Sequence, residues 1–564
     1  MLSLAWLVLL LVGSKAFRRP VAYVSTLHGK LARVGVAVSP NLDMGVDEGM
    51  RQESHSISTV DCVEGFFKQF NDMPHASSPE AVAAQELRDQ GVLTLQKIKD
   101  GKIGFPTGKA EAWRHSNLRT IFPCEKYGVR GNSELDRELI AERINEYVDE
   151  NCEGSCIVYV DGRFDGALSR LDNLPDQVNI DTFGTGSVCG SGGVTRIPVV
   201  RACMTAVPDA NELGRDSFSS DSLTAVNMAN CIDACLIHVA KGEKVGDPVH
   251  IINYSTDGTT GDSDEDSDNS SNRGNGGAGK TMPTSFPKVV VVLEKGSQLS
   301  FKQSFIGRES TVGKSLKAGD LKNAALVLSN THIHVSEGAI LEHSYEQDLP
   351  AEHRHLEVVH ADLYTGAAYD LCVLQSGAKT GRVNAHINLH ETNSSCRLNS
   401  VNLSHQRQHH DLHSSIVHSA PECESRQQHR NVLGYRGETV FKGRIRIPKI
   451  AQKTESEQLC RTLILGEKSR LVAMPTLEIT ADDVVCSHGA AVADLDENSM
   501  FYLSARGIDR REARKLLLRG FSLEVLEGGI MDKKAMERVI AKTDAMTPED
   551  DRRVQGSNQR MISM

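Results

Sequence analysis

Cys486 and His488 are separated by a single residue in the segment ADDVVCSHGAAVADL, which has the composition of a β-strand. On a strand, residues i and i+2 point to the same side, so this thiol and this imidazole would lie next to each other. A thiolate and a neutral imidazole suit iron or a sulfur-bridged cluster. Because a lone C-x-H pair also occurs where no metal binds, the pattern defines candidate iron ligands and does not assign a metal by itself.

A literal match to a phosphate-binding loop is a weaker candidate. Gly274, Gly279, Lys280 and Thr281 satisfy the pattern G-x-x-x-x-G-K-T. A working loop needs a buried strand before it and a helix after it, which together cradle the phosphates. The acidic segment DSDEDSDNSSNR precedes the match and MPTSFP follows it, so we expect neither a strand nor a helix there. We therefore reject a nucleotide site.

Histidine is abundant, with 21 residues in the chain, and three of them, His409, His410 and His413, could suggest a metal. Consecutive histidines on a strand point to opposite faces, so we expect solvated or hydrogen-bonded side chains instead. The chain has no HExxH, GxSxG or CxxC motif and no convincing acid–base or nucleophile constellation. These observations favour a scaffold and not an enzyme.

The elements that carry these residues change in character along the chain. Helical periodicity is expected in residues 58–98 and 134–150. Residues 156–164, CIVYVDGRF, are β-prone and are bounded by an Asp-Gly turn. From about residue 286 to 505, short β-prone runs follow one another without a long helix. Such a chain must stack its strands into a sandwich, a propeller or a β-helix, and the pattern alone does not choose among these.

Two further segments complete the mature chain. Residues 255–281 are acidic and then Gly-rich, and they contain too little apolar surface to offset their ordering entropy, so we expect a disordered loop. Residues 509–527 return to helix, and a shorter amphipathic stretch follows at 531–543. The apolar stripe of the longer helix consists of Ala513, Leu516, Leu517 and Phe521.

The N-terminus has the composition of a two-part targeting sequence. Residues 2–12 form an apolar run that is too short to span a bilayer comfortably, and small residues follow it. From Phe17 to Leu42 there is no Asp or Glu, as in a transit peptide. We expect a signal peptide at 1–16 and a plastid transit peptide at 17–50.

Composition excludes several classes of function. The net charge of −11 and the 5% aromatic content argue against general nucleic-acid binding. The 13 cysteines lack the spacing of a disulfide framework or of a zinc site. We expect the two close pairs, Cys152/Cys156 and Cys231/Cys235, to be buried thiols.

Several segments resemble the SufB/SufD family of iron–sulfur cluster assembly scaffolds, and within it SufD. The resemblance covers most of residues 100–527 and is strongest after residue 400. SufB-type chains carry Glu-His-Glu-Ala where this chain has CSHGA, which favours SufD. The segments that carry the resemblance are GKAEAWRHSNL (108–118), LIHVAKGEKVGDPVHI (236–251), SHQRQHHDLHSSIVHSAPECESRQQHRNVLGYRGETVFKGRI (404–445), AQKT (451–454), PTLEI (475–479), CSHGA (486–490) and FYL-x-x-RGI (501–508).

The resemblance implies a mainly β fold, with a right-handed parallel β-helix between N-terminal and C-terminal helical regions. The domains expected are an N-terminal helical region (55–155), the β-helix core (156–505), a C-terminal helical region (506–545) and a disordered tail (546–564). It also implies a hetero-oligomer with SufB and the SufC ATPase. The two-part targeting sequence resembles the leaders of algae with complex plastids, so we expect this hetero-oligomer in the plastid stroma. The C-terminal helices would bind SufC, with Leu516, Leu517 and Phe521 as candidate contacts.

The resemblance further implies a nascent cluster at the SufB–SufD interface, with His488 contributing and Cys486 beside it. We expect no tightly bound cofactor in the isolated chain, no nucleic-acid partner and no membrane association of the mature form. Cys460 falls where SufB-type chains keep an essential cysteine. It precedes Cys486 by 26 residues, about one coil of a β-helix, so it is a third candidate. The alternatives are a SufB-like scaffold that holds a cluster alone and a β-helix carbohydrate-active enzyme.

Overall fold

The computed structural model of the protein describes residues 79–547, with gaps at 100–109, 117, 124–125, 130–135, 149–154, 173, 184–185, 191, 207–217, 257–280, 309–323, 467 and 527–530. The predicted signal peptide (1–16) and transit peptide (17–50) lie outside the described residues. So do most of the acidic insertion and residues 548–564 of the tail.

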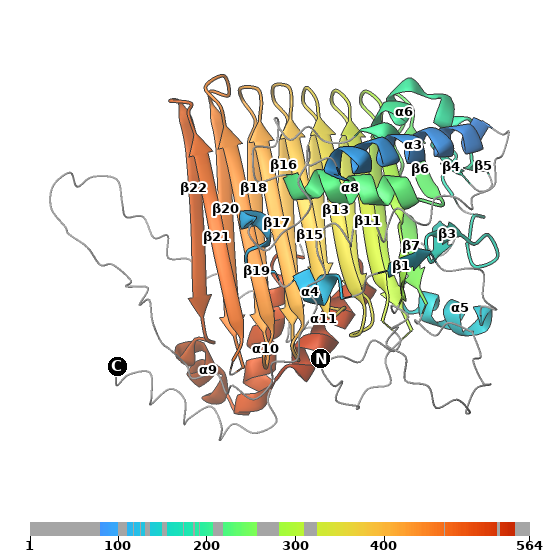
Figure 1. Ribbon diagram of the computed structural model, residues 1–564. Helices are drawn as coiled ribbons and strands as arrows, with labels where there is room; N and C mark the ends of the chain where they lie inside the picture. The colour runs from blue at the N-terminus through green and yellow to red at the C-terminus, as the bar shows by residue number, and fades with distance from the viewer. Residues whose placement is uncertain are drawn as a thin grey trace, which may run out of the picture.

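Two mainly parallel sheets form the body of the protein (Figure 1). Sheet A contains, from one end to the other, β21 (Arg470–Ile479), β19 (Glu438–Ile447), β17 (His409–His418), β15 (Thr380–Leu389), β13 (Arg354–Leu363), β11 (Leu326–Val335), β9 (Lys288–Leu293), β6 (Ala234–Val239), β4 (Val178–Thr182) and β5 (Gly186–Cys189), with β8 (Thr281–Ser285) pairing β11 and β1 (Lys126–Val129). Sheet B contains β22 (Val484–Ala493), β20 (Thr454–Ile464), β18 (Glu424–Leu433), β16 (Ser395–Ser404), β14 (Ala368–Gln375), β12 (Ile340–Asp348), β10 (Gln298–Gly307), β7 (Val249–Ser255), β2 (Cys156–Val160) and β3 (Arg163–Phe164).

From β9 to β22, successive strands alternate between the two sheets, so each of these coils contributes one strand to each sheet. Coils stack at the ~4.8 Å spacing of paired strands. Glycines make the tight turns between the sheets: Gly296, Gly338 and Gly366 have φ of +69°, +65° and +63°, a conformation that a side chain disfavours. The predicted parallel β-helix between N-terminal and C-terminal helical regions is therefore confirmed.

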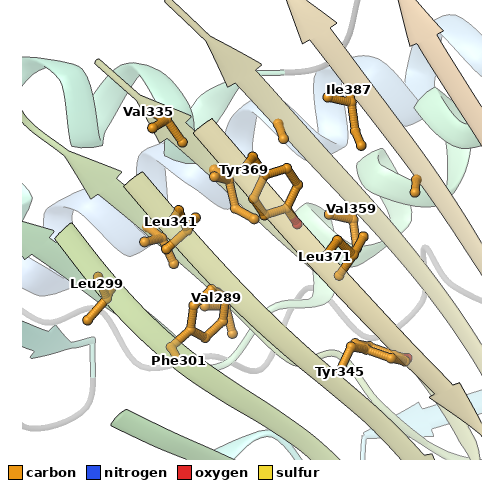
Figure 2. Close-up of a cluster of buried hydrophobic side chains, with 14 of the residues drawn as sticks. Val289, Leu299, Phe301, Val335, Leu341, Tyr345, Val359, Tyr369, Leu371 and Ile387 are labelled. Carbon is orange, nitrogen blue, oxygen red and sulfur yellow. The ribbon is translucent and has the colours of Figure 1, made fainter. Parts of the chain in front are cut away.

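The space between the sheets, here called the lumen, is apolar in the early coils. Figure 2 shows side chains from both sheets converging there, among them Val289, Phe301, Leu341 and Ile387, which are all buried. Burial of each such side chain stabilises the folded state by about 1.5–3 kcal/mol, so this cluster is the main source of stability in the early coils.

The lumen becomes polar in the later coils. Gln375 donates a hydrogen bond to Asn402 (3.0 Å), Asn402 donates to Asn431 (2.8 Å), and Asn431 donates to Thr462 Oγ1 (3.0 Å). These residues belong to successive strands of sheet B and occupy equivalent positions in register. The ladder satisfies buried amides from coil to coil, as a solvent-free interior requires.

Helices cover the outer faces of both sheets. Sheet A is covered by α3 (Pro79–Lys99), α6 (Pro198–Thr205) and α8 (Phe218–Asn230) (Figure 1). Sheet B packs against α10 (Arg510–Leu523) and α11 (Lys533–Ala545). The shorter helices are η2 (Glu111–Trp113), α4 (Leu118–Ile121), α5 (Arg137–Asn145), η4 (Val194–Arg196) and α9 (Glu497–Ser504). Among the described residues, no helix combines the length and the apolar character needed to cross a membrane.

The predicted boundaries need adjustment at several points. The range 156–505 was expected to be β-helix, but helices α6 and α8 lie inside it. The last strand of the β-helix ends at Ala493. The acidic insertion is narrower than 255–281, because Ser255 ends β7 and Thr281 begins β8. Strand β8 follows the rejected phosphate-loop pattern, in place of the helix that such a loop requires.

Candidate functional site

Cys486 and His488 lie on β22, the last strand of sheet B, which pairs in parallel with β20. Cys486 is in register with Ser456, and His488 is in register with Gln458. Ser456 and Gln458 are buried in the lumen. Cys486 and His488 share one side of the strand, as their spacing predicted. Because residues in register on a parallel pair point the same way, both project from the lumen side of the terminal coil.

The two side chains differ in environment. His488 is exposed, whereas Cys486 is half-buried against an apolar group that includes Ile445, Ile447 and Leu477. Burial raises the pKa of the Cys486 thiol, and a backbone hydrogen bond with Ser456 opposes that shift. A raised pKa favours the thiol over the thiolate, so a metal would have to displace the proton on binding.

Cys460 is one coil below this pair but not beneath Cys486. It lies on β20 in register with Ala490. Only 1% of it is exposed, and Asn431 Nδ2 donates a hydrogen bond to its Sγ at 3.4 Å. Burial raises the pKa of the Cys460 thiol to about 11. Cys460 thus lies one coil from the pair, but this coil spans 30 residues, from Ser456 to Cys486, so Cys460 is not in register with Cys486.

The residues in register beneath the pair on successive strands of sheet B, here called columns, are polar. Below Cys486, the hydroxyls of Ser456 and Ser425 are 2.8 Å apart, and Ser425 is 2.9 Å from His418 Nε2. Below His488 lies Gln458, 1% exposed, whose two amide atoms have no hydrogen-bond partner. In the parts of the chain that the structure describes, no three His, Cys, Asp or Glu side chains are grouped so as to hold a metal ion.

The coil that carries the pair is at an open end of the solenoid (Figure 1). β21 and β22 are the outermost strands of the two sheets, and no described strand pairs with their outer edges. Large apolar side chains are exposed on both strands: Ile479 by 38%, Val485 by 72% and Val492 by 57%. An unpaired edge with apolar side chains is a surface that another sheet can extend.

The C-terminal helical residues that were predicted to contact a partner also make contacts within the protein. Leu517 packs in a small cluster with Met500 and Leu503 of α9. Phe521 packs against the sheet B cluster, and the Arg430 guanidinium lies 5.5 Å from its ring centroid. Leu516 is half-buried. The stripe thus mainly attaches α10 to the body of the protein.

The exposed aromatic residues in this region are on α9. Phe501 is 75% exposed and Tyr502 is 41% exposed. The guanidinium of Arg506 lies 3.5 Å from the ring centroid of Tyr502. Both residues belong to the FYL-x-x-RGI segment, and their spacing in the sequence does not reveal that both rings face solvent.

One buried constellation was missed by sequence reasoning. Arg382 lies on the outer face of sheet A, with its guanidinium 3.6 Å from the ring centroid of Trp113. It also donates to the carbonyl oxygen of Ala112 (2.9 Å) and lies 3.5 Å from Asp411. Ser116 donates to the same carboxylate. These contacts attach segment 110–116 to the sheet, so we call the constellation the N-terminal clasp.

His409 extends the clasp, with Nε2 2.6 Å from Asp411 and Nδ1 3.2 Å from Glu438. Burial alone would lower the pKa of His409, but the two carboxylates raise it to about 10. His410 points into the lumen and contacts the carbonyl oxygen of Gly377 at 2.7 Å. His409 and His410 are therefore hydrogen-bonded on opposite faces of the strand, as expected. They are too buried to be solvated side chains.

Comparison with known proteins agrees with this architecture. Residues 274–521 match the protein-family model "SUF system FeS cluster assembly, SufBD core domain". The solenoid contains a SufBD core domain. The matched range of the SufBD core contains both Cys486 and His488, together with the strands that form the open end.

Relatives of this SufBD protein cover most of the described body. It is 28% identical over 463 residues to "Protein ABCI7, chloroplastic" of Arabidopsis thaliana, covering 82% of this chain and 86% of that protein. It is 23% identical to "Iron-sulfur cluster assembly protein SufD" of Escherichia coli, covering 79% and 90%. The Plasmodium falciparum protein of the same name is 28% identical over 46% of this chain and 17% of that protein. The chain is thus a SufD-like assembly factor.

Proposed function

We propose that this chain is the SufD-type scaffold subunit of a plastid SUF complex, and that Cys486 and His488 contribute ligands to a nascent iron–sulfur cluster. The observation that carries the proposal is the position of this pair at the open end of the solenoid, on the same side of one strand. The cluster is the cargo of the complex, so the two ligands need only hold it transiently. Two ligands of mixed type leave coordination positions for a partner protein and for sulfide.

The partner at the open end is a SufB-type protein. β21 and β22 present unpaired edges, and Ile479, Val485 and Val492 supply an exposed apolar surface beside them. A partner with the same solenoid fold could extend both sheets and cover the apolar side chains in one step. The pair of cluster ligands would then lie in the seam between the two proteins.

The C-terminal helices are proposed to bind the SufC-type ATPase, which would carry out the ATP hydrolysis. Phe501 and Tyr502 of α9 are exposed, and Leu516 of α10 is half-buried. The neighbouring helix α11 is anchored to sheet B, because Arg538 makes two contacts of 2.7 and 2.6 Å with the carboxylate of the buried Glu346. A rigidly attached α11 would transmit movement of SufC to the solenoid. Leu517 and Phe521 would act by holding α10 in place.

A plastid location is supported by the chloroplastic relative and by the composition of residues 1–50. A segment without acidic residues after a short apolar run is typical of import through two membrane systems. Fusion of residues 1–50 to a fluorescent protein tests this directly. Fluorescence confined to the plastid is expected, and secretion of the fusion would contradict it.

Assembly is the first test of the proposal. We expect the chain, co-expressed with the SufB- and SufC-type proteins of its source organism, to purify as a complex of all three. Substitution of Val492 or Ile479 by Glu places a charge on the apolar end and should weaken SufB binding at least tenfold without unfolding the chain. Ile340, which is 42% exposed in the middle of the solenoid, provides the matched control Ile340→Glu. Equal SufB binding by all three variants would rule out the open end as the interface.

A further inference from the structure

Gln458 is a buried amide in the polar part of the lumen. It is 1% exposed, and neither its amide nitrogen nor its amide oxygen has a hydrogen-bond partner. A buried polar group without a partner costs about 1–3 kcal/mol. An apolar residue of similar size would therefore give a more stable coil, so the amide calls for an explanation other than stability.

The amide lies one layer beneath the candidate cluster ligands. Gln458 is in register with His488 on the last strand of sheet B. Its side chain crosses the lumen to Gly443 of β19, where a Cβ would come within 2.1 Å of Gln458 Nε2. Gly443 is in register with Pro475 of β21. The amide is thus next to the terminal coil, and the residues in register above it are His488 and Pro475.

The chemistry of a metal held by Cys486 and His488 supplies a partner for this amide. A tetrahedral ion takes four ligands, so this pair leaves positions for water or sulfide. Groups hydrogen-bonded to the ligands of a metal orient them, and their loss typically reduces metal affinity 10- to 100-fold. An amide offers an N–H donor, and water or sulfide can accept it.

We propose that Gln458 is a positioning residue: its Nε2 donates a hydrogen bond to a water or sulfide ligand of an iron ion held by Cys486 and His488. The inference rests on the proposed function, because it requires that pair to bind a metal. It assigns a role to a residue of the preceding coil that does not itself contact the metal.

Gln427, one coil deeper in the same column, is the matched control. Its oxygen accepts a hydrogen bond from Ser414 at 2.7 Å and lies 3.3 Å from His429 Nε2. Removing this side chain would leave buried partners unsatisfied, whereas removing Gln458 would not. Substitution of Gln458 should therefore lower metal affinity and leave stability intact, whereas substitution of Gln427 should lower stability and leave metal affinity intact.

The test is a titration of the untagged full-length chain with Co²⁺ under anaerobic conditions, followed by the thiolate-to-cobalt charge-transfer band. We expect Gln458→Leu to weaken Co²⁺ binding about tenfold while its resistance to urea is unchanged or increased. We expect Gln427→Leu to unfold at lower urea concentration while its folded form binds Co²⁺ as the wild type does. Cys486→Ala should remove the band.

The outcomes distinguish the role of Gln458 from metal binding by Cys486 and His488. If Cys486→Ala removes the band but Gln458→Leu binds Co²⁺ like the wild type, the role of Gln458 is refuted and the metal pair stands. If the band is absent from the wild type or persists in Cys486→Ala, the pair itself fails, and the inference about Gln458 falls with it. A drop in both stability and affinity for Gln458→Leu would indicate a structural role and would also overturn the proposal.

Discussion

Cys486 is in register with Ser456 on the neighbouring strand, so the thiol continues a column of hydroxyl groups and not a column of cysteines. Cys460 occupies a different column, beneath Ala490. The open end therefore presents one half-buried thiol, and a second thiol is enclosed one coil below it. Cys460 and Cys486 were predicted to lie close together, but their different burial gives them different reactivities.

Thiol labelling tests this difference. In the native protein, a maleimide should modify Cys486 at least ten times faster than Cys460, because Cys460 is 1% exposed and its sulfur is hydrogen-bonded to Asn431. Burial also raises the pKa of Cys460 to about 11, which lowers its thiolate fraction further. Site-resolved mass spectrometry measures both rates. Equal labelling in the absence of urea would show that the terminal coil opens in solution.

The N-terminal clasp should contribute strongly to stability. Asp411 is fully buried between Arg382 and His409, so Asp411→Asn leaves the buried Arg382 guanidinium without its carboxylate and leaves Glu438 as the carboxylate partner of His409. We expect a loss of about 3–5 kcal/mol in the free energy of unfolding. The control Glu438→Gln removes a carboxylate that is 45% exposed and should cost less than about 1 kcal/mol. Similar losses for the two variants, measured by urea unfolding, would contradict the assignment.

The buried Glu357 should make stability fall as pH rises. Burial raises the pKa of this carboxyl to about 8, although hydrogen bonds from Ser329 and Thr331 oppose the shift. The folded state binds the proton more tightly than the unfolded state, so this stabilisation is complete below the ordinary pKa of Glu and is lost as pH rises through 8.

Glu357→Gln mimics the protonated form and lacks this dependence. The difference in free energy of unfolding, Glu357→Gln minus wild type, should be about 2–4 kcal/mol larger at pH 8 than at pH 5. Other titrating groups contribute to both proteins and cancel in this difference. The exposed Glu455 provides the control Glu455→Gln, for which no such gain is expected. A constant difference between wild type and Glu357→Gln across this range would exclude a neutral Glu357.

Gly443 should be intolerant of a side chain for a local reason. A Cβ at this position would stand 2.1 Å from Gln458 Nε2 and 2.7 Å from the Phe441 ring. We expect Gly443→Ala to cost about 1–3 kcal/mol. The double variant with Gln458→Ala should recover at least about 0.5 kcal/mol of that loss, because one of the two obstacles is gone. Additive losses in the double variant would mean that Gln458 does not cross the lumen to Gly443.

Much of the fold is predictable from local pattern. The alternation of Ala385, Ile387 and Leu389 places these three residues in the lumen, and all are fully buried. Glycines at the ends of β-prone runs mark turns with positive φ. The choice of a β-helix over a sandwich came from the resemblance, because alternation reports which side a residue faces and not which strand lies next to it.

The parts that escaped prediction depend on register. The pairing of Cys486 with Ser456 is set by a coil of 30 residues, while other coils differ in length, as the register of Leu341 with Tyr369 shows. The contact of Trp113 with Arg382 joins residues from distant parts of the chain, so no local pattern could reveal it. The stripe on α10 was correctly periodic, but periodicity does not say whether an apolar face meets the protein's own body or a partner.

The central claim is that His488 holds iron at a seam shared with a partner. The most direct measurement is the iron and acid-labile sulfide content of the anaerobically purified three-protein complex carrying His488→Ala. We predict an intact complex with at least a fivefold lower content than the wild type, while Gln428→Ala on the outer face of β18 keeps the wild-type content. An intact His488→Ala complex with undiminished iron and sulfide would contradict the account.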